Sequence, residues 1–224
     1  MIIAPSLLSA DFGKIASEAC RIERAEADWI HCDVMDGTFV PNISFGPAVV
    51  KSVNQVTKIP LDVHLMCCNP EILFEAFVNA GADIMTIHVE LGSKVETLLW
   101  KIRSLGIKVG LAISPPTSID TVKPYLKSID LLLVMTVNPG FGGQPFIHEC
   151  LPKIQQVAAW RKKLGRKFHI EVDGGINDET ALECASAGAD VFVSGSALLG
   201  QGRLKTAVAR MRRIVQHTAI SASH

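Results

Sequence analysis

The sequence predicts an α/β fold, a (β/α)8 TIM barrel built as a single domain over residues 1–224. Three observations predict it: eight short runs rich in Ile, Val and Leu, longer segments of helical period between them, and a chain of 224 residues, a length at which such barrels form one unit. The runs are apolar on both faces, as is typical of parallel strands covered by helices. A doubly wound open sheet is the alternative.

The apolar runs are the predicted strands, and they are residues 2–8, 29–35, 61–66, 84–89, 109–113, 131–137, 168–172 and 191–193. Between them, apolar residues three and four apart predict amphipathic helices. These helices are residues 11–25, 71–80, 95–104, 152–164, 180–187 and 204–215. In the last helix, basic residues alternate with apolar ones, so we expect a solvated face. The small, polar residues 218–224 predict a frayed tail.

A short motif marks every second predicted strand. It is Ala27-Asp28, Ala82-Asp83, Ile129-Asp130 and Ala189-Asp190. In two copies a glycine, Gly81 or Gly188, precedes the motif where a helix end favours a left-handed residue. The spacing of this weak repeat supports eight β/α units.

The composition excludes several classes of protein. With 48% hydrophobic and 20% charged residues the chain is a folded globule, and 22 basic against 22 acidic residues give no support for a nucleic-acid or anionic-membrane partner. The six cysteines lack C-x-x-C spacing, which indicates buried filler in a reducing compartment. The start of the chain lacks the pattern of a signal peptide, and the apolar runs have strand length. We expect a soluble, cytoplasmic protein.

Polar residues recur at the carboxyl ends of the predicted strands, where a barrel builds its site. His31 and Asp33 are two apart, so they share one face of the second strand. His64 lies on the neighbouring third strand, and Asp173 ends the seventh, across the mouth. Burying two carboxylates and two imidazoles without a balancing cation costs several kcal/mol per unpaired charge.

This set predicts a divalent metal such as zinc, iron, manganese or cobalt. A metal-free acid/base pair is the alternative. Carboxylates on opposite sides of a substrate suggest that one removes a proton and the other returns one to the opposite face, which inverts a stereocentre. Such chemistry needs one carboxyl with a raised pKa and an ionised partner. We expect His88, Glu90, His169 and Glu171 to be structural.

Three glycine-rich loops follow the sixth, seventh and eighth strands: residues 138–144, Gly174-Gly175 and Gly195-Ser196. They neighbour one another in a barrel, and backbone N–H groups at such turns bind phosphate. Tight turns that need positive φ are the alternative for any single loop. Three methionines, Met35, Met66 and Met135, lie near strand ends, where they serve as core packing or as an apolar cover over a developing anion.

Five motifs together resemble the ribulose-phosphate 3-epimerase family over nearly the whole chain. They are residues 4–12 (APSLLSADF), 31–37 with 40–42 (HCDVMDG, VPN), 63–66 (VHLM), 137–144 (VNPGFGGQ) and 171–175 (EVDGG). The related allulose-6-phosphate 3-epimerases resemble G-F-A-G and D-G-S where this chain has G-F-G-G and D-G-G, so we favour the pentose substrate.

The resemblance implies an isomerase of the pentose phosphate pathway that interconverts D-ribulose 5-phosphate and D-xylulose 5-phosphate. It implies one divalent metal ion held by His31, Asp33, His64 and Asp173, with Asp33 and Asp173 catalytic. The implied substrate contacts are Ser6, His64, Gly140, Phe141, Gly142, Gly143, Asp173, Gly174, Gly175, Gly195 and Ser196. The implied pocket lining is Met35, Met66 and Met135. A homo-oligomer, dimer or hexamer, is also implied.

Two segments depart from the family pattern: residues 113–117 (ISPPT), in place of an asparagine-proline-glycine type of loop, and Glu90-Leu91-Gly92. Two other classes of function share the glycine loops. One is a metal-dependent aldolase or isomerase acting on another sugar phosphate, and the other is a sensor that binds a phosphate ligand without turnover.

Overall fold

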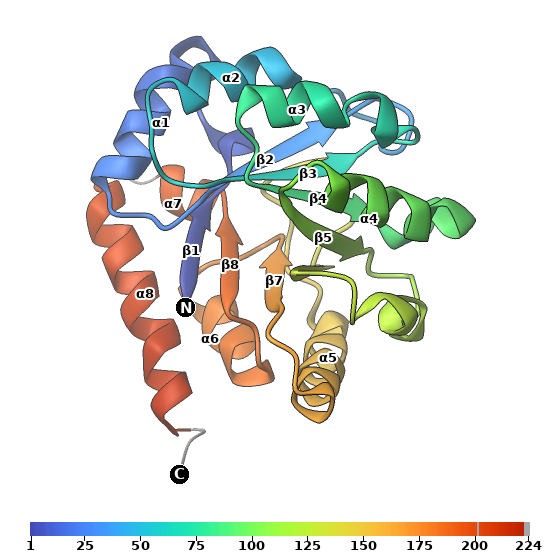
Figure 1. Cartoon of the computed structure of the whole chain (residues 1–224). Helices are drawn as coiled ribbons and strands as arrows, with labels where there is room; N and C mark the ends of the chain where they lie inside the picture. Colours follow the sequence, from blue (N-terminus) through green and yellow to red (C-terminus); the bar gives the residue numbers. More distant parts are fainter. Residues whose placement is uncertain (201, 222–224) are drawn as a thin grey trace.

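The computed structural model describes residues 1–200 and 202–221, and for residues 217–221 it describes the backbone alone. Its parallel strands form a barrel with the helices outside (Figure 1). The strands are β1 (Ile2–Pro5), β2 (Ile30–Met35), β3 (Leu61–Met66), β4 (Ile84–His88), β5 (Lys108–Ile113), β6 (Leu131–Met135), β7 (His169–Asp173) and β8 (Val191–Ser194). Each predicted strand is present, so the (β/α)8 barrel is confirmed.

The sheet closes between its first and second strands. The hydrogen-bonded order is β1-β8-β7-β6-β5-β4-β3-β2, and a parallel bridge between Ser6 and His31 joins the two ends. The carbonyl of Ile3 also accepts from the N–H groups of Asp28 and Trp29, at 3.0 and 3.4 Å. Closure removes the free edges that a doubly wound sheet would leave.

The helices are α1 (Ile15–Arg24), α2 (Pro47–Asn54), α3 (Phe74–Ala80), α4 (Val95–Ser104), α5 (Leu151–Leu164), α6 (Asp178–Ala187), α7 (Ser196–Leu199) and α8 (Leu204–Ser221). The sequence pattern missed α2 and α7, which are short. After β5 the chain forms a 3₁₀ helix, η5 (Ile119–Tyr125), with Pro124 inside it. Proline lacks the N–H that an α-helix interior requires.

The first strand is shorter than predicted because Ser6 starts a turn. Its hydroxyl accepts from the N–H of Leu8 at 3.2 Å and caps the 3₁₀ helix η1 (Leu7–Ser9). The serine oxygen gives the N–H of Leu8 an acceptor within the turn, so this N–H needs no partner on a neighbouring strand. The chain therefore bends over the carboxyl end of the barrel directly after β1.

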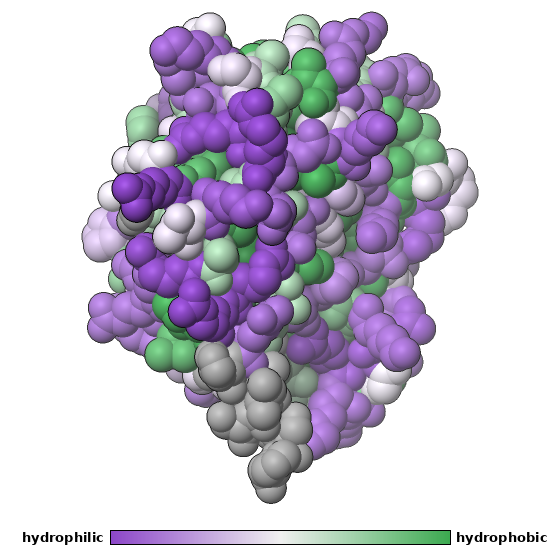
Figure 2. Space-filling model, turned by 90° about the vertical axis from the view of Figure 1, so that its left-hand side faces the viewer, coloured by the Kyte–Doolittle hydropathy of each residue, from purple (hydrophilic) through white to green (hydrophobic). Residues whose placement is uncertain are grey.

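The last helix has the solvated basic face that its sequence predicts. Leu204, Ala207, Val208 and Met211 are buried. The basic residues pair with acidic ones, in the ion pairs Lys205 with Glu26, Arg210 with Asp178, and Arg212 with Asp28. Hydrophilic residues predominate on the side of the molecule where α1 and α8 lie (Figure 2).

The segment that the sequence assigns to a frayed tail overlaps the last helix. The helix α8 continues to Ser221, so residues 218–221 are helical, whereas residues 222–224 lie outside the described residues. Residues 216–221 contain no glycine or proline that would end the helix earlier.

The aspartates of the sequence repeat join the strands in pairs. Each lies before an even-numbered strand and accepts a backbone N–H of the odd-numbered strand that precedes it. The donors to Asp28, Asp83, Asp130 and Asp190 are Ile3, Leu61, Val109 and Ile170, at 2.7, 2.8, 2.9 and 3.2 Å. The repeat is thus a device for pairing strands.

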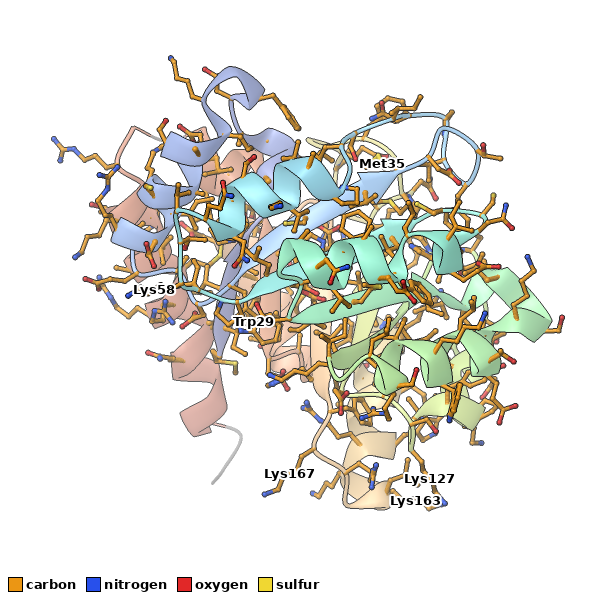
Figure 3. All side chains as sticks on the ribbon, turned by 45° about the horizontal axis from the view of Figure 1, so that its top comes forward. Trp29, Met35, Lys58, Lys127, Lys163 and Lys167 are labelled. Carbon is orange, nitrogen blue, oxygen red and sulfur yellow. The ribbon has the colours of Figure 1, made fainter. Side chains whose placement is uncertain are left out.

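The barrel interior is apolar at one end and polar at the other. Trp29, Ile84, Leu131 and Val191 fill it near the amino ends of the strands. Figure 3 shows Trp29 and Met35 at opposite ends of β2. Polar side chains of β2, β3 and β7, among them Asp33, His64 and Asp173, lie toward the carboxyl end. Two more acids, Asp62 and Glu171, are buried deeper, in register with Ile84 and Val191.

All six cysteines are free, and Cys32, Cys67, Cys150 and Cys184 are buried, as expected of core filler. Within residues 1–200 and 202–221, no helix has both the length and the apolar character needed to cross a bilayer.

Candidate active site

A cavity of about 470 Å³ opens at the carboxyl end of the barrel. Its walls include fourteen of the sixteen residues to which the sequence assigns a site role. These are Ser6, Asp33, Met35, Met66, Met135, Gly140, Phe141, Gly142, Gly143, Asp173, Gly174, Gly175, Gly195 and Ser196. The other two, His31 and His64, are fully buried next to Asp33.

His31, Asp33, His64 and Asp173 converge, with one donor atom of each within 4.8 Å of the others. Oδ1 of Asp33 lies 3.2 Å from Nε2 of His31 and 3.1 Å from Nδ1 of His64. Ligand atoms that each lie about 2.1 Å from one metal ion are about 3 Å apart. The described residues can therefore hold a divalent cation, and imidazoles with carboxylates are the donors that zinc, iron, manganese and cobalt accept.

The second oxygen of Asp33 is held by Ser6, whose hydroxyl donates to Oδ2 at 2.7 Å. The hydroxyl of Ser44 donates to the Asp33 carbonyl at 2.5 Å and accepts from the N–H of Met35 at 3.1 Å. Asp33 is 3% exposed. Its carboxylate is consequently fixed in one orientation, with Oδ1 toward the imidazoles.

Asp173 ends β7 on the opposite side of the cavity. The Thr136 hydroxyl donates to the carbonyl oxygens of Asp173 and Gly174, at 2.9 and 2.6 Å, which fixes the end of the strand. The following turn needs glycine for two reasons. Gly175 has φ +65°, and a Cβ there would lie 2.6 Å from the backbone nitrogen of Phe146.

The loops of the two sides of the mouth meet over the cavity. The amide of Asn42, in the loop after β2, donates to the carbonyl of Gly140, in the loop after β6, at 2.7 Å. The amide of Gln144 donates to the carbonyls of Asn138 and Phe141, at 2.7 and 2.8 Å, which folds the second loop into a tight turn. Phe141 remains 54% exposed at the rim.

The two carboxyl groups have opposite electrostatic surroundings. Burial raises the pKa of Asp33, but the charge of His31 and hydrogen bonds from His31 and His64 lower that pKa below its ordinary value. Burial and the charge of Asp33 raise the pKa of Asp173 to about 7. At neutral pH Asp33 is therefore ionised, while Asp173 is partly protonated.

The two histidines also differ. Burial lowers the pKa of His64 to about 4, so this imidazole is neutral at pH 7. Burial also lowers the pKa of His31, but the carboxylates of Asp33 and Asp62 raise it well above its ordinary value. The carboxylates around His31 thus favour a positive charge on this imidazole or next to it.

Sequence reasoning missed Asp62, which lies behind His31. Its Oδ2 is 2.7 Å from Nδ1 of His31, and Glu171 lies on the same side at 3.7 Å. Both acids are fully buried, and burial with the charge of Asp62 raises the pKa of Glu171 well above its ordinary value. A signal was available: Asp62 and His64 are two apart on one strand, as His31 and Asp33 are.

His88 and Glu90, which we expected to be structural, lie behind the candidate ligand His64. His88 lies 2.8 Å from His64, and Glu90 lies 2.8 Å from His88. Burial raises the pKa of Glu90, but hydrogen bonds from His88, Thr117 and Ser114 lower it to about 2. Glu90 is therefore an ionised carboxylate at neutral pH.

The sequence profile of the Ribulose-phosphate 3 epimerase family matches residues 2–199. The ribulose-phosphate 3-epimerase of Bacillus subtilis is 46% identical over 211 residues, which cover 94% of this chain and 97% of that protein. The chain belongs to the ribulose-phosphate 3-epimerase family. The ribulose-phosphate 3-epimerase of Synechocystis is 44% identical over 214 residues, which cover 95% of this chain and 93% of that protein. The family and the epimerase activity expected from the resemblance are confirmed.

Solved structures with low identity share the fold of this epimerase. KGPDC from Streptococcus mutans in complex with D-R5P has a TM-score of 0.74 at 14% identity, covering 96% of this chain and 97% of that one. The 3-hexulose-6-phosphate synthase of Salmonella typhimurium has a TM-score of 0.66 at 17% identity, covering 97% and 100%. At these identities the likeness shows the barrel alone.

Proposed function

We propose that this epimerase interconverts D-ribulose 5-phosphate and D-xylulose 5-phosphate by moving a proton at C3 through a 2,3-enediolate, as a step of the pentose phosphate pathway. One observation carries the proposal: Asp33 on β2 and Asp173 on β7 face one cavity from different strands, with pKa values displaced in opposite directions. A base and an acid on opposite sides of a carbon are what an inversion requires.

In one direction of the reaction, the ionised Asp33 takes the C3 proton from one face of the sugar, and the protonated Asp173 gives a proton to the other face. The reverse reaction starts from the opposite protonation states. Ser6 keeps Asp33 oriented through its 2.7 Å hydrogen bond, so the base does not rotate away from the substrate.

The donor set of His31, Asp33, His64 and Asp173 fits one divalent cation, and we assign zinc, iron, manganese or cobalt to it. When bound, that ion supplies positive charge that stabilises the oxygens of an enediolate. The buried imidazoles hold the ligand positions, and Met35, Met66 and Met135 line the cavity and exclude water from it.

The phosphate group of the substrate fits the glycine loops. Residues 140–143, 174–175 and 195–196 line one wall of the cavity, and their backbone N–H groups are the donors that a phosphate requires. Phe141 at the rim would cover the bound sugar.

We further propose that this epimerase is cytoplasmic and forms a homo-oligomer, either a dimer or a hexamer. Gel filtration would measure the size of the assembly.

Asp173→Asn tests the proposal, because asparagine keeps the size of the side chain but exchanges no proton. We expect turnover of ribulose 5-phosphate to fall at least about 10²-fold while binding of inorganic phosphate is retained. In deuterated water, the wild-type enzyme should place deuterium at C3 alone.

Near-normal turnover by the Asp173→Asn variant would contradict the two-carboxylate assignment. Cleavage of a carbon–carbon bond would indicate an aldolase instead. Tight binding of the sugar phosphate without any turnover by the wild-type protein would indicate a sensor.

A further inference from the structure

A chain of hydrogen bonds runs from His64 away from the cavity. Nδ1 of His64 faces Asp33 at 3.1 Å, and Nε2 lies 2.8 Å from Nε2 of His88. Nδ1 of His88 lies 2.8 Å from Oε2 of Glu90. Both histidines are fully buried, whereas the side chain of Glu90 is 23% exposed. This series of hydrogen bonds thus joins the candidate metal centre to the outer loops.

The chemistry of these groups allows one arrangement of protons when Nδ1 of His64 binds a cation. A metal ligand must present a lone pair, so the neutral His64 carries its proton on Nε2 and donates it to His88. Nε2 of His88 then accepts, which places the proton of His88 on Nδ1. That N–H points at Glu90, whose carboxylate only accepts. Every donor in the chain then meets an acceptor.

The other oxygen of Glu90 is fixed by the loop after β5. Oε1 accepts from the backbone N–H of Ser114 at 2.8 Å and from the hydroxyl of Thr117 at 2.6 Å. Lys153 braces this loop by donating to the carbonyls of Ser114, Pro115 and Thr117, at 3.2, 2.6 and 2.6 Å. The carboxylate therefore cannot turn without leaving the Ser114 N–H unpaired. The segment of residues 113–117, which departs from the family pattern, thus contacts Glu90 through Ser114 and Thr117.

We propose that Glu90 and His88 are positioning residues for His64: Glu90 sets which nitrogen of His88 carries a proton, and His88 thereby keeps the Nδ1 lone pair of His64 free for a cation. The inference rests on the proposed function, because it needs the metal centre. Partners of this kind, behind metal-binding histidines, typically change metal affinity 10- to 100-fold when mutated.

Glu90→Gln should reverse the direction of donation along the hydrogen bonds that link residue 90, His88 and His64. The N–H of Ser114 requires an acceptor, so the amide oxygen takes the place of Oε1 and the amide nitrogen faces His88. His88 must then accept at Nδ1 and carry its proton on Nε2, which makes His64 carry its own proton on Nδ1, where the cation would bind. We expect the affinity for zinc, measured by competition with a chelating dye, to fall at least about 10-fold.

Two variants serve as controls. Glu96→Gln, on the exposed face of α4, also removes one negative charge but lies outside the hydrogen-bonded series. This variant should bind zinc as the wild type does. His88→Gln can still accept from His64 through its oxygen and donate to Glu90 through its nitrogen. Its zinc affinity should therefore lie closer to the wild-type value than that of Glu90→Gln.

Nitrogen NMR of the histidine rings provides a readout that a merely structural role would not change. In the zinc-loaded wild type, His88 should be protonated on Nδ1, and in Glu90→Gln on Nε2. A wild-type His88 protonated on Nε2, or a Glu90→Gln variant that binds zinc normally, would overturn this inference and leave the proposed function intact. A wild-type protein that binds no zinc or related ion would overturn this inference together with the cation assigned under the proposed function.

Discussion

Asp33 and Asp173 are the same amino acid, yet their surroundings give them opposite acidities. Asp33 accepts from the Ser6 hydroxyl and faces two imidazoles, which favour its charged form. Asp173 lies partly buried within reach of the Asp33 charge, which favours its neutral form. The asymmetry that an acid/base pair needs is therefore present before substrate binds.

This asymmetry can be measured in the metal-free protein. A negative charge on Asp33 disfavours a second negative charge on Asp173, so removing it with Asp33→Asn should lower the Asp173 pKa from about 7 toward the ordinary range. Carbon NMR of the carboxyl groups would follow the titration. Ser6→Ala leaves the Asp33 charge in place and should keep the raised pKa. An unchanged Asp173 pKa in Asp33→Asn would contradict this account.

At the residue scale, the sequence brought the four candidate ligands together because the alternation of side chains along a strand is sufficient. His31 and Asp33 are two apart on β2, so they share a face, and His64 is the register partner of Asp33 on β3. Asp173 ends β7. The sequence did not identify Asp62 or the contact between His64 and His88. Those roles depend on which ring nitrogen faces which neighbour, and residue spacing carries no information on how a side chain turns about its own bonds.

At the scale of single elements, strands were predicted better than helices. Barrel strands are buried on both faces, which leaves a continuous apolar run. The connection after β5 has no such signature, and its proline gives η5 instead of an α-helix. The short helix α2 buries Val50 and Val53 but has too few turns to show a helical period.

The repeated aspartates give an element-scale prediction. Asp130 accepts from the N–H of Val109 and pairs with Arg103, both at 2.9 Å. Asp130→Ala leaves that N–H without its acceptor and should lower the free energy of unfolding by about 1–3 kcal/mol. Asp130→Asn keeps an oxygen acceptor and loses only an exposed ion pair, which contributes about 0–1 kcal/mol.

Urea unfolding of both variants would test this account, with the exposed Asp120→Ala as a control that should unfold like the wild type. Equal loss in Asp130→Ala and Asp130→Asn would show that the charge, not the strand-pairing hydrogen bond, is what matters.

At the scale of the whole molecule, the candidate ligands come from β2, β3 and β7, on different parts of the ring. A cation bound to the folded barrel alone stabilises it, by about 2.7 kcal/mol at a hundredfold excess over its dissociation constant. We therefore expect a chelator to lower the thermal midpoint by several degrees. His64→Ala, which lacks one ligand, should respond less. A midpoint that does not change with chelator in the wild type would argue against the cation.

The hydrogen bond between Asn42 and Gly140 spans the two halves of the chain. On the proposed function, the amino-terminal half contributes His31, Asp33 and His64. The carboxy-terminal half contributes Asp173, which acts on the other face of the same carbon, and the glycine loops that bind the phosphate. With this arrangement, substitutions in the amino-terminal half would alter contacts with the sugar, while the glycine loops would still bind the phosphate group that all sugar phosphates share.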